Sequence, residues 1–233
     1  MKILAIDTAT ESCSAALYVD GQVIVRELEF DRGHAEHILP MVDEVLGAAS
    51  MSPDALDALA FGRGPGGFTG VRMAASVVQG LAFAWGRVVV PVSDLAAVAQ
   101  RALDRDAAGR VLVCNDARMQ EVYWGCFERG PNGLAALVGL EHVGPVSAVT
   151  LPTAWAGAPL ASVVGVGRGF SAYPDLLVAV GPRVRVLDDR LLPRATEIAK
   201  LAVAEVQAGR VVTAEEAIPV YLRDDVARPQ SRN

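Results

Sequence analysis

The sequence predicts an α/β protein made of two similar halves, each with a mixed sheet and flanking helices. An aliphatic run that ends in an acidic residue, "KILAI" before Asp7, is followed by a hairpin signal. The same pattern recurs in "RVLVCND", which ends at Asp116 and leads into a second hairpin signal. Helical periods alternate with short β-branched runs in the rest of the chain. Two such halves within one chain indicate a duplicated domain.

The first half is expected to begin with three antiparallel strands. Three strand-like runs follow one another, "KILAI", "CSAALYV" and "QVIVREL", and Asp20-Gly21 separates the last two. This pair favours a tight hairpin because a type I′ turn needs positive φ at both central residues.

A helix is expected in "HAEHILPMVDEVLGAA". Its apolar residues recur with a helical period at Ile38, Met41, Val42, Val45 and Leu46. Pro40 predicts a kink or a delayed start in this helix. Ser52 followed by Pro53 predicts a further helix start, with serine as the cap.

The glycine-rich stretch "GRGPGGFTGVR" follows the strand-like run "ALAFG". Gly62, Gly64 and Gly67 satisfy the G-x-G-x-x-G spacing of dinucleotide-binding loops. That fingerprint requires an acidic residue about 20 positions later, to bind the ribose. No Asp or Glu lies between Asp57 and Asp94, so the sequence argues against a dinucleotide site.

A P-loop is also disfavoured, because Phe68 stands where the phosphate-binding lysine belongs. We therefore predict a sharp strand-to-helix turn, in which Thr69 caps a helix that runs to Trp85. An anion site at this helix start, assisted by Arg63 or Arg72, is the alternative.

The remaining elements complete the two halves. "VVVPV" and "ASVVGVG" are predicted strands, and "SDLAAVAQRAL" is a predicted helix capped by Ser93. A turn is expected at Asn132-Gly133, and the helix "ATEIAKLAVAEVQAG" is expected to end at Gly209. We divide the chain into lobes at residues 1–105 and 106–226, followed by a flexible tail at 227–233.

Composition limits the classes of function. The chain has 233 residues, of which 52% are hydrophobic, and its net charge of -6 argues against nucleic-acid binding by the isolated protein. The three cysteines form no C-x-x-C pair, which favours buried reduced thiols in a cytoplasmic protein. No signal peptide or membrane-spanning run is expected.

The sequence gives only weak support for two candidate sites, one for a metal and one for a nucleotide. His34 and His37 share a helical face, but a metal site needs more ligands, so we expect surface residues and no metal. Thr8 and Thr10 after Asp7 are compatible with a phosphate-binding turn, which makes these three residues a weak nucleotide site. Asp116 is followed by bulkier residues, Ala117 and Arg118, so the second turn is doubtful. No Ser-His-Asp or Cys-His arrangement supports a peptidase.

Several motifs resemble the TsaB (YeaZ) family: "LAIDTA", "HAEHILPMVDEVL", "GRGPGGFTGVRMAAS", "DARMQEVYWG" and "PVYLRDDV". They occur in the family's order between about Lys2 and Val226, and Gly67 departs from the serine that the family usually has. The resemblance implies two actin-like (ASKHA, RNase H-like) lobes.

The resemblance also implies a non-catalytic subunit that dimerises with the transferase TsaD. Together with the ATPase TsaE and the enzyme that makes threonylcarbamoyl-adenylate, this pair forms N6-threonylcarbamoyladenosine at position 37 of tRNAs reading ANN codons. ATP and metal are then expected on the partner subunits, and none on this chain alone. Asp94 and Val98 stand where TsaD has its metal-binding H-x-x-x-H. Contact with tRNA is expected through the complex, and a homodimer is an alternative for the isolated chain.

The resemblance places the partner interface on two helices, at His34, Ile38, Met41, Met73, Ala74, Val77, Val78 and Leu81. The second helix is apolar almost all round, so the sequence leaves open which of its stripes faces the lobe. An ATP-dependent phosphotransferase of the same fold is the main alternative function, and a peptidase-like protein is another.

Overall fold

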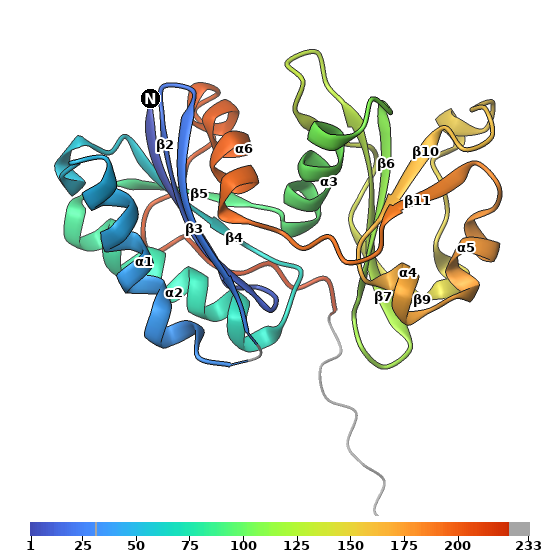
Figure 1. Cartoon of the computed structure of the whole chain (residues 1–233), viewed down its shortest axis with the longest axis horizontal. Helices are drawn as coiled ribbons and strands as arrows, with labels where there is room; N and C mark the ends of the chain where they lie inside the picture. The colour runs from blue at the N-terminus through green and yellow to red at the C-terminus, as the bar shows by residue number, and fades with distance from the viewer. Residues whose placement is uncertain (31, 224–233) are drawn as a thin grey trace, which may run out of the picture.

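The computed structural model describes residues 1–30 and 32–223, which form two lobes side by side (Figure 1). The first lobe holds a five-stranded sheet in the order β3-β2-β1-β4-β5. Its strands are β1 (Lys2–Asp7), β2 (Ser12–Val19), β3 (Gln22–Glu29), β4 (Ala58–Gly62) and β5 (Val88–Val92). β1 pairs antiparallel with β2 and parallel with β4, so the sheet is mixed as predicted.

The second sheet repeats this topology. Its order is β11-β10-β6-β7-β8, with β9 also paired to β7. Its strands are β6 (Arg110–Asp116), β7 (Glu121–Arg129), β8 (Ala135–Leu137), β9 (His142–Pro145), β10 (Val163–Val166) and β11 (Val184–Asp188). In each sheet a central strand that ends in an aspartate has a hairpin partner on one side and two parallel strands on the other. The predicted duplication is confirmed at the level of topology.

The helices are distributed unequally between the lobes. The longer ones are α1 (His34–Ala48), α2 (Phe68–Trp85), α3 (Asp94–Arg105) and α6 (Ala195–Gln207). The second lobe has short helices, α4 (Gly169–Ala172) and α5 (Asp175–Val180), and 3₁₀ turns at Val146–Ala148 and Thr153–Trp155. The first lobe has a 3₁₀ turn at Pro53–Ala55, just before β4. None of the helices in the described ranges is both long and apolar enough to cross a bilayer.

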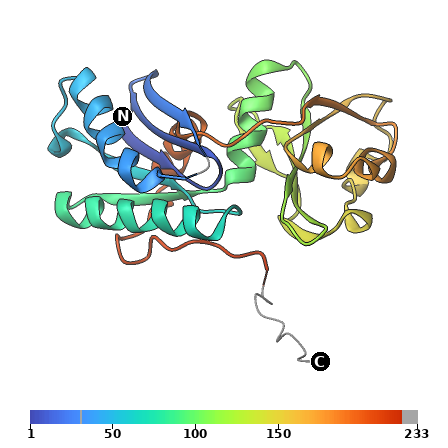
Figure 2. The same ribbon diagram turned by 60° about the horizontal axis from the view of Figure 1, so that its bottom comes forward.

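The central strands β1 and β4 of the first sheet are buried on both faces. Leu4 and Ile6 of β1 point into a core shared with α1 and α2, whereas Ile3 and Ala5 point toward α6 on the opposite face. β1 and β4 therefore carry continuous apolar runs, as expected for strands that are covered on both sides. Figure 2 shows α2 lying between α1 and the C-terminal segment of the chain.

The structure corrects the predicted lobe boundaries. α3 packs on the second sheet, where Leu95, Val98 and Leu103 join its core. α6 packs on the first sheet through Ala195, Ile198 and Ala202, among others. The chain then stays with the first lobe, because Val212 pairs with Val89. A cut after residue 105 would thus assign α3 and α6 to the wrong lobes, and the predicted tail at 227–233 lies outside the described residues.

The structure confirms two of the local predictions and contradicts two others. Asp20 and Gly21 have φ of 45° and 98°, which confirms the predicted turn, and Ser93 caps α3 as predicted. α1 begins at His34 and runs through Pro40, so its start is not delayed. Ser52 precedes only a 3₁₀ turn and makes no capping hydrogen bond.

We expect opposite effects from alanine at two glycines of α2. At Gly70 a Cβ would lie 2.0 Å from the Thr8 carbonyl oxygen, whereas at Gly80 it would meet nothing within 4 Å. Gly70→Ala should lower the free energy of unfolding by more than about 2 kcal/mol through overpacking. Gly80→Ala should raise it by up to about 1 kcal/mol, because alanine favours helix more than glycine does. Urea unfolding of the two variants measures both effects, and equal effects would contradict the close approach.

Candidate functional site

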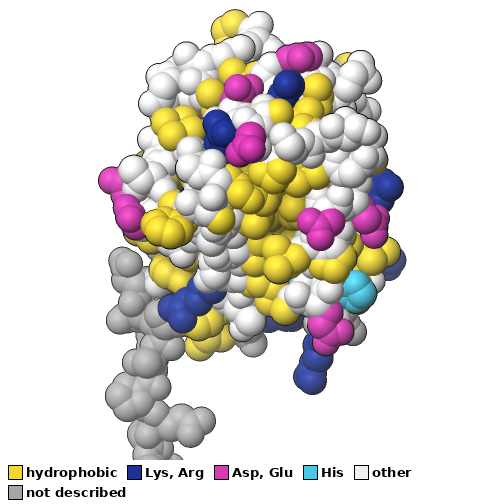
Figure 3. Space-filling model, turned by 90° about the vertical axis from the view of Figure 1, so that its left-hand side faces the viewer, with side chains coloured by type: hydrophobic (Ala, Val, Ile, Leu, Met, Phe, Trp, Pro, Cys, Tyr) yellow, Lys and Arg dark blue, Asp and Glu magenta, His cyan; other side chains and the backbone are white. Residues whose placement is uncertain are grey.

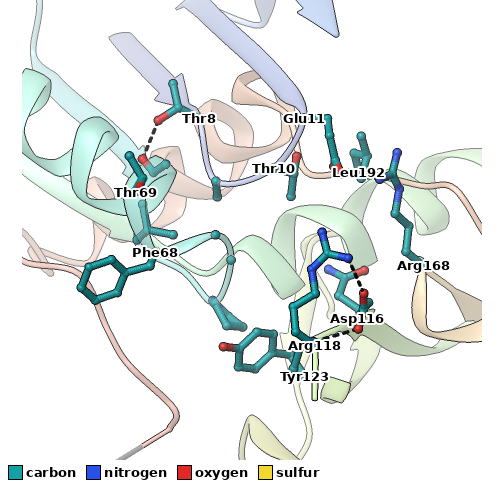
Figure 4. Close-up of a pocket in the computed structure, with 18 of the residues that line it drawn as sticks. Thr8, Thr10, Glu11, Phe68, Thr69, Asp116, Arg118, Tyr123, Arg168 and Leu192 are labelled. Carbon is teal, nitrogen blue, oxygen red and sulfur yellow. Dashed lines mark hydrogen bonds and ion pairs between the residues drawn. The ribbon is translucent and has the colours of Figure 1, made fainter. Parts of the chain in front are cut away.

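A cleft of about 1020 Å³ opens between the two lobes (Figure 4). Its walls include the β1–β2 turn, the start of α1, the glycine loop with the start of α2, the β6–β7 turn, the region of α4 and the C-terminal residues 220–223. Thr8, Thr10, Glu11, Phe68, Asp116, Arg118, Tyr123 and Arg168 are among the side chains that line it.

The glycine loop is docked against the β1–β2 turn. The Gly67 N–H donates to the Ala9 carbonyl oxygen at 2.7 Å, and the Thr8 hydroxyl donates to the Gly70 carbonyl oxygen at 2.7 Å. A Cβ at Gly66 would lie 2.6 Å from the same Ala9 oxygen, so this contact excludes a side chain there. The prediction that the loop makes a sharp strand-to-helix turn is confirmed.

The predicted cap of α2 is wrong. Gly67 occupies the N-cap position, and no side chain caps the helix. Thr69 lies within the first turn and is exposed. The extended conformation needed at the cap is supplied by Gly67, with φ -63° and ψ 126°.

The weak nucleotide site does not come together as predicted. Thr8 and Thr10 line the cleft, but Asp7 does not, because its side chain is fully buried behind the turn. The Thr8 hydroxyl is engaged by Gly70, and the Thr10 hydroxyl oxygen accepts from the Ser12 N–H at 3.2 Å. These side chains serve the turn itself.

The corresponding turn of the second lobe is closed by its own side chains. The Asp116 carboxylate accepts from the Arg118 N–H at 2.8 Å and from the Tyr173 hydroxyl at 2.9 Å, and it pairs with the Arg118 guanidinium at 3.2 Å. Arg118, Met119 and Gln120 all have φ between 55° and 61°. Three consecutive non-glycine residues in the left-handed region cost about 1–2 kcal/mol each. No glycine in "DARMQE" signals this turn, so the sequence could not predict it.

The C-terminal segment crosses the mouth of the cleft. The Val220 N–H donates to the Arg63 carbonyl oxygen at 2.8 Å, and the Tyr221 hydroxyl accepts from the Arg72 guanidinium at 2.7 Å. Arg223 then reaches the second lobe, where it donates to the Ala117 carbonyl oxygen at 3.3 Å and pairs with Glu121. This segment fastens the strained β6–β7 turn to the first lobe.

The histidines and cysteines make no reactive centre among the described residues. The Nε2 atom of His34 lies 2.9 Å from the Thr10 carbonyl oxygen, within hydrogen-bond distance, and His37 is exposed. No group of three or more His, Cys, Asp or Glu within residues 1–30 and 32–223 could hold a metal ion. Burial raises the pKa of Cys13 and of Cys126 to about 12 each, and that of Cys114 rises well above its usual value. All three cysteines therefore remain protonated thiols at neutral pH.

An apolar surface covers the outer side of α1 and α2, which we call the α1–α2 face. Figure 3 shows hydrophobic side chains gathered across the middle of this side of the molecule. On α2, Met73, Val77 and Leu81 are partly exposed and Ala84 is exposed. On α1, Leu39 is 48% exposed.

Half of the predicted interface residues are not on this surface. Ile38, Met41, Ala74 and Val78 are at most 4% exposed and belong to the core of the first lobe. The stripe through Ala74 and Val78 therefore faces the lobe, and the stripe through Met73 and Val77 faces outward. The helical period could not distinguish them, because α2 is apolar nearly all round.

Comparison with known proteins agrees with this architecture. Residues 28–229 match the family model of TsaD, tRNA N6-adenosine threonylcarbamoyltransferase. The chain is 41% identical to the tRNA threonylcarbamoyladenosine biosynthesis protein TsaB of Escherichia coli, over 97% of this chain and 96% of that protein. The TsaB of Haemophilus influenzae is 35% identical, over 97% of this chain and 95% of its own length.

Two solved structures share the fold closely. The structure described as YeaZ from Pseudomonas aeruginosa superposes with a TM-score of 0.86 at 44% identity, covering 95% of this chain and 99% of that one. A second, described as an uncharacterized protein with similarity to peptidase YEAZ from the same organism, gives 0.88 at 45% identity over the same shares. With matches of this extent in both sequence and structure, and with its two actin-like lobes, the chain belongs to the TsaB (YeaZ) family.

Proposed function

We propose that this protein is a non-catalytic subunit in the formation of N6-threonylcarbamoyladenosine at position 37 of tRNAs reading ANN codons. In this role it dimerises with a TsaD-type transferase in the cytoplasm and works with a TsaE-type ATPase. ATP and metal are bound by the partners, and tRNA is engaged through the complex. The names of the relatives support the pathway, and the α1–α2 face supports the mode of action.

The observation that carries the proposal is the apolar α1–α2 face. Met73, Val77 and Leu81 present aliphatic surface beside small residues, Gly80 and Ala84, on a helix of 18 residues. Small residues allow the backbone of another helix to approach closely, and burial of apolar side chains gives about 25 cal/mol per Å². Contiguous exposed apolar surface of this kind is typical of an interaction site.

The match to the TsaD family model supports a partner that is related to this chain. A TsaD-type protein shares the fold and so offers two corresponding helices. Two helix pairs can pack face to face about an approximate two-fold axis, as in an isologous dimer interface. The same geometry would permit a homodimer of this chain, which competes with the heterodimer for one face.

The residues of the site support neither of the two alternative functions, an ATP-dependent phosphotransferase or a peptidase-like protein. A phosphotransferase needs free groups to hold phosphates, but Asp116 and Arg118 neutralise each other and Thr8 is engaged by Gly70. A cysteine peptidase needs a thiolate, whereas burial raises the pKa of the thiols.

Arginine at two adjacent positions of α2 should separate binding from folding. Met73→Arg should leave the melting temperature nearly unchanged and weaken binding of a TsaD-type partner at least about 100-fold, because an unpaired charge in a dry interface costs several kcal/mol. Ala74→Arg should prevent folding, since Ala74 is fully buried. Sedimentation and circular dichroism measure both effects.

Val178→Arg is the matched control, because Val178 is 82% exposed on α5 of the other lobe. It should fold and bind like the unaltered protein. Undiminished partner binding by a folded Met73→Arg variant would exclude the α1–α2 face as the interface.

The absence of a catalytic role is tested by reconstitution. Omission of this chain from a mixture of TsaD, TsaE and the adenylate-forming enzyme should abolish or sharply reduce the modified nucleoside. Asp116→Ala and His37→Ala should keep product formation within a few fold, since neither side chain is expected to touch a reacting group. The isolated chain should neither hydrolyse ATP nor retain zinc or iron after purification. Loss of product by several orders of magnitude in one folded variant would contradict the proposal.

A further inference from the structure

Two buried carboxyl groups meet behind the glycine loop. Asp7 ends β1, and Asp94 begins α3 directly after β5. β1 and β5 flank β4 in parallel, so their carboxyl ends lie at the same edge of the sheet. At Gly62, the end of β4, a Cβ would lie 2.3 Å from Asp94 Oδ1 and 2.6 Å from Asp7 Oδ1. The two carboxyl groups thus occupy the space that a side chain at Gly62 would need.

Each carboxyl group holds one backbone amide of the cleft wall. Asp7 Oδ1 accepts from the Ala9 N–H at 3.0 Å, and Asp94 Oδ2 accepts from the Gly64 N–H at 2.5 Å. The Asp94 N–H returns a hydrogen bond to the Gly64 carbonyl oxygen at 3.1 Å. The pair therefore connects the β1–β2 turn, the glycine loop and the start of α3.

Burial and the neighbouring Asp7 raise the pKa of Asp94 more than the charge of Arg63 lowers it. Both side chains are fully buried, and Asp7 Oδ2 and Asp94 Oδ1 have no hydrogen-bond donor from the protein. Arg63 on the glycine loop is paired with Glu141 at 3.1 Å. Glu27 on β3 adds negative potential at Asp7, and the Cys13 thiol on β2 is neutral. Two ionised carboxylates in this position would be prohibitively costly.

We propose that Asp7 and Asp94 share a single proton at neutral pH and thereby lock the glycine loop against the β1–β2 turn. The proton lies between the two oxygens that lack a donor, so that one carboxylic acid donates to one carboxylate. Loss of this proton places two like charges in contact and drives the two turns apart. This inference concerns the isolated chain and does not depend on the proposed function.

The direction of the pH dependence follows from the surroundings. Desolvation by burial raises the pKa of Asp7 from 3.8 to about 6. It raises that of Asp94 well above 3.8, and the neighbouring Asp7 raises it further. In the unfolded chain both groups lose their protons near their ordinary values, whereas the folded chain retains them. Stability from this pair is therefore complete below about pH 4 and falls as the pH rises through 6.

Infrared spectroscopy and unfolding of the full chain test the shared proton. The unaltered protein should show a protonated carboxylic-acid band at pH 7, and Asp94→Asn should remove it. Between pH 5 and 6 the folding equilibrium constant of the unaltered protein should fall by at least about tenfold, because the folded pair retains more than one proton that the unfolded chain has lost. In Asp94→Asn the fall in the folding equilibrium constant over this pH range should be less than about twofold, whereas the exposed control variant Asp43→Asn should keep the full fall. The reason is that the amide introduced at position 94 donates a hydrogen bond to Asp7 at every pH.

Asp7→Asn is the reciprocal variant, and Asp43→Asn, at an exposed position of α1, is the matched control. Asp7→Asn should also remove the band, whereas Asp43→Asn should retain both the band and the pH dependence. The absence of a protonated band from the unaltered protein at pH 7 would overturn the proposal. A pH dependence in both Asn variants equal to that of Asp43→Asn would overturn it as well.

Discussion

The first lobe depends on direct backbone contact between the β1–β2 turn and the glycine loop. The carbonyl oxygens of Thr8 and Ala9 lie where side chains at Gly70 and Gly66 would otherwise be. This contact fixes where α2 leaves the sheet, and so determines which of its stripes packs on the core. The exposure of the stripe through Met73 and Val77, on which the proposed subunit function rests, thus follows from the close approach of the β1–β2 turn and the glycine loop.

Much of this fold could be predicted because its signals are local. The opening hairpin follows from Asp20-Gly21, the cap of α3 from Ser93, and the repeat of both sheets from two aliphatic runs that end in aspartate. The predictions that were wrong concern features that depend on tertiary contacts. The glycine loop encodes its own N-cap at Gly67, although Thr69 is the better capping residue by type. The amphipathic pattern of a helix does not indicate which sheet the helix packs on. The boundary predicted at residue 105 therefore places α3 and α6 in the wrong lobes.

The candidate site shows the same division. The sequence could indicate an apolar helix suited to a partner, but not which half of it is exposed. It could identify Asp7 as unusual, but not its pairing with Asp94. That pairing arises because β1 and β5 are parallel and end at one edge of the sheet. The left-handed conformation of Arg118 to Gln120 had no sequence signal, since the turn is held by Asp116 and by contacts of Arg223 with its flanking residues Ala117 and Glu121. In the described part of the chain, the cleft side chains bind one another and the apolar face of α2 is partly exposed, and both features suit the proposed subunit role.

The position of α6 has a consequence for the order of events during synthesis. The inner face of the first sheet, formed by residues such as Ile3, Ala5 and Val90, is covered by Ile198 and Ala202. A nascent chain that has completed β1 to β5 still lacks this cover until almost all of it has left the ribosome. Until then one face of the sheet is exposed to solvent and to chaperones, and domain-by-domain folding from the N-terminus is unavailable to it. The first lobe, although its sheet is synthesised first, is therefore expected to reach its native state only after the second lobe has been synthesised.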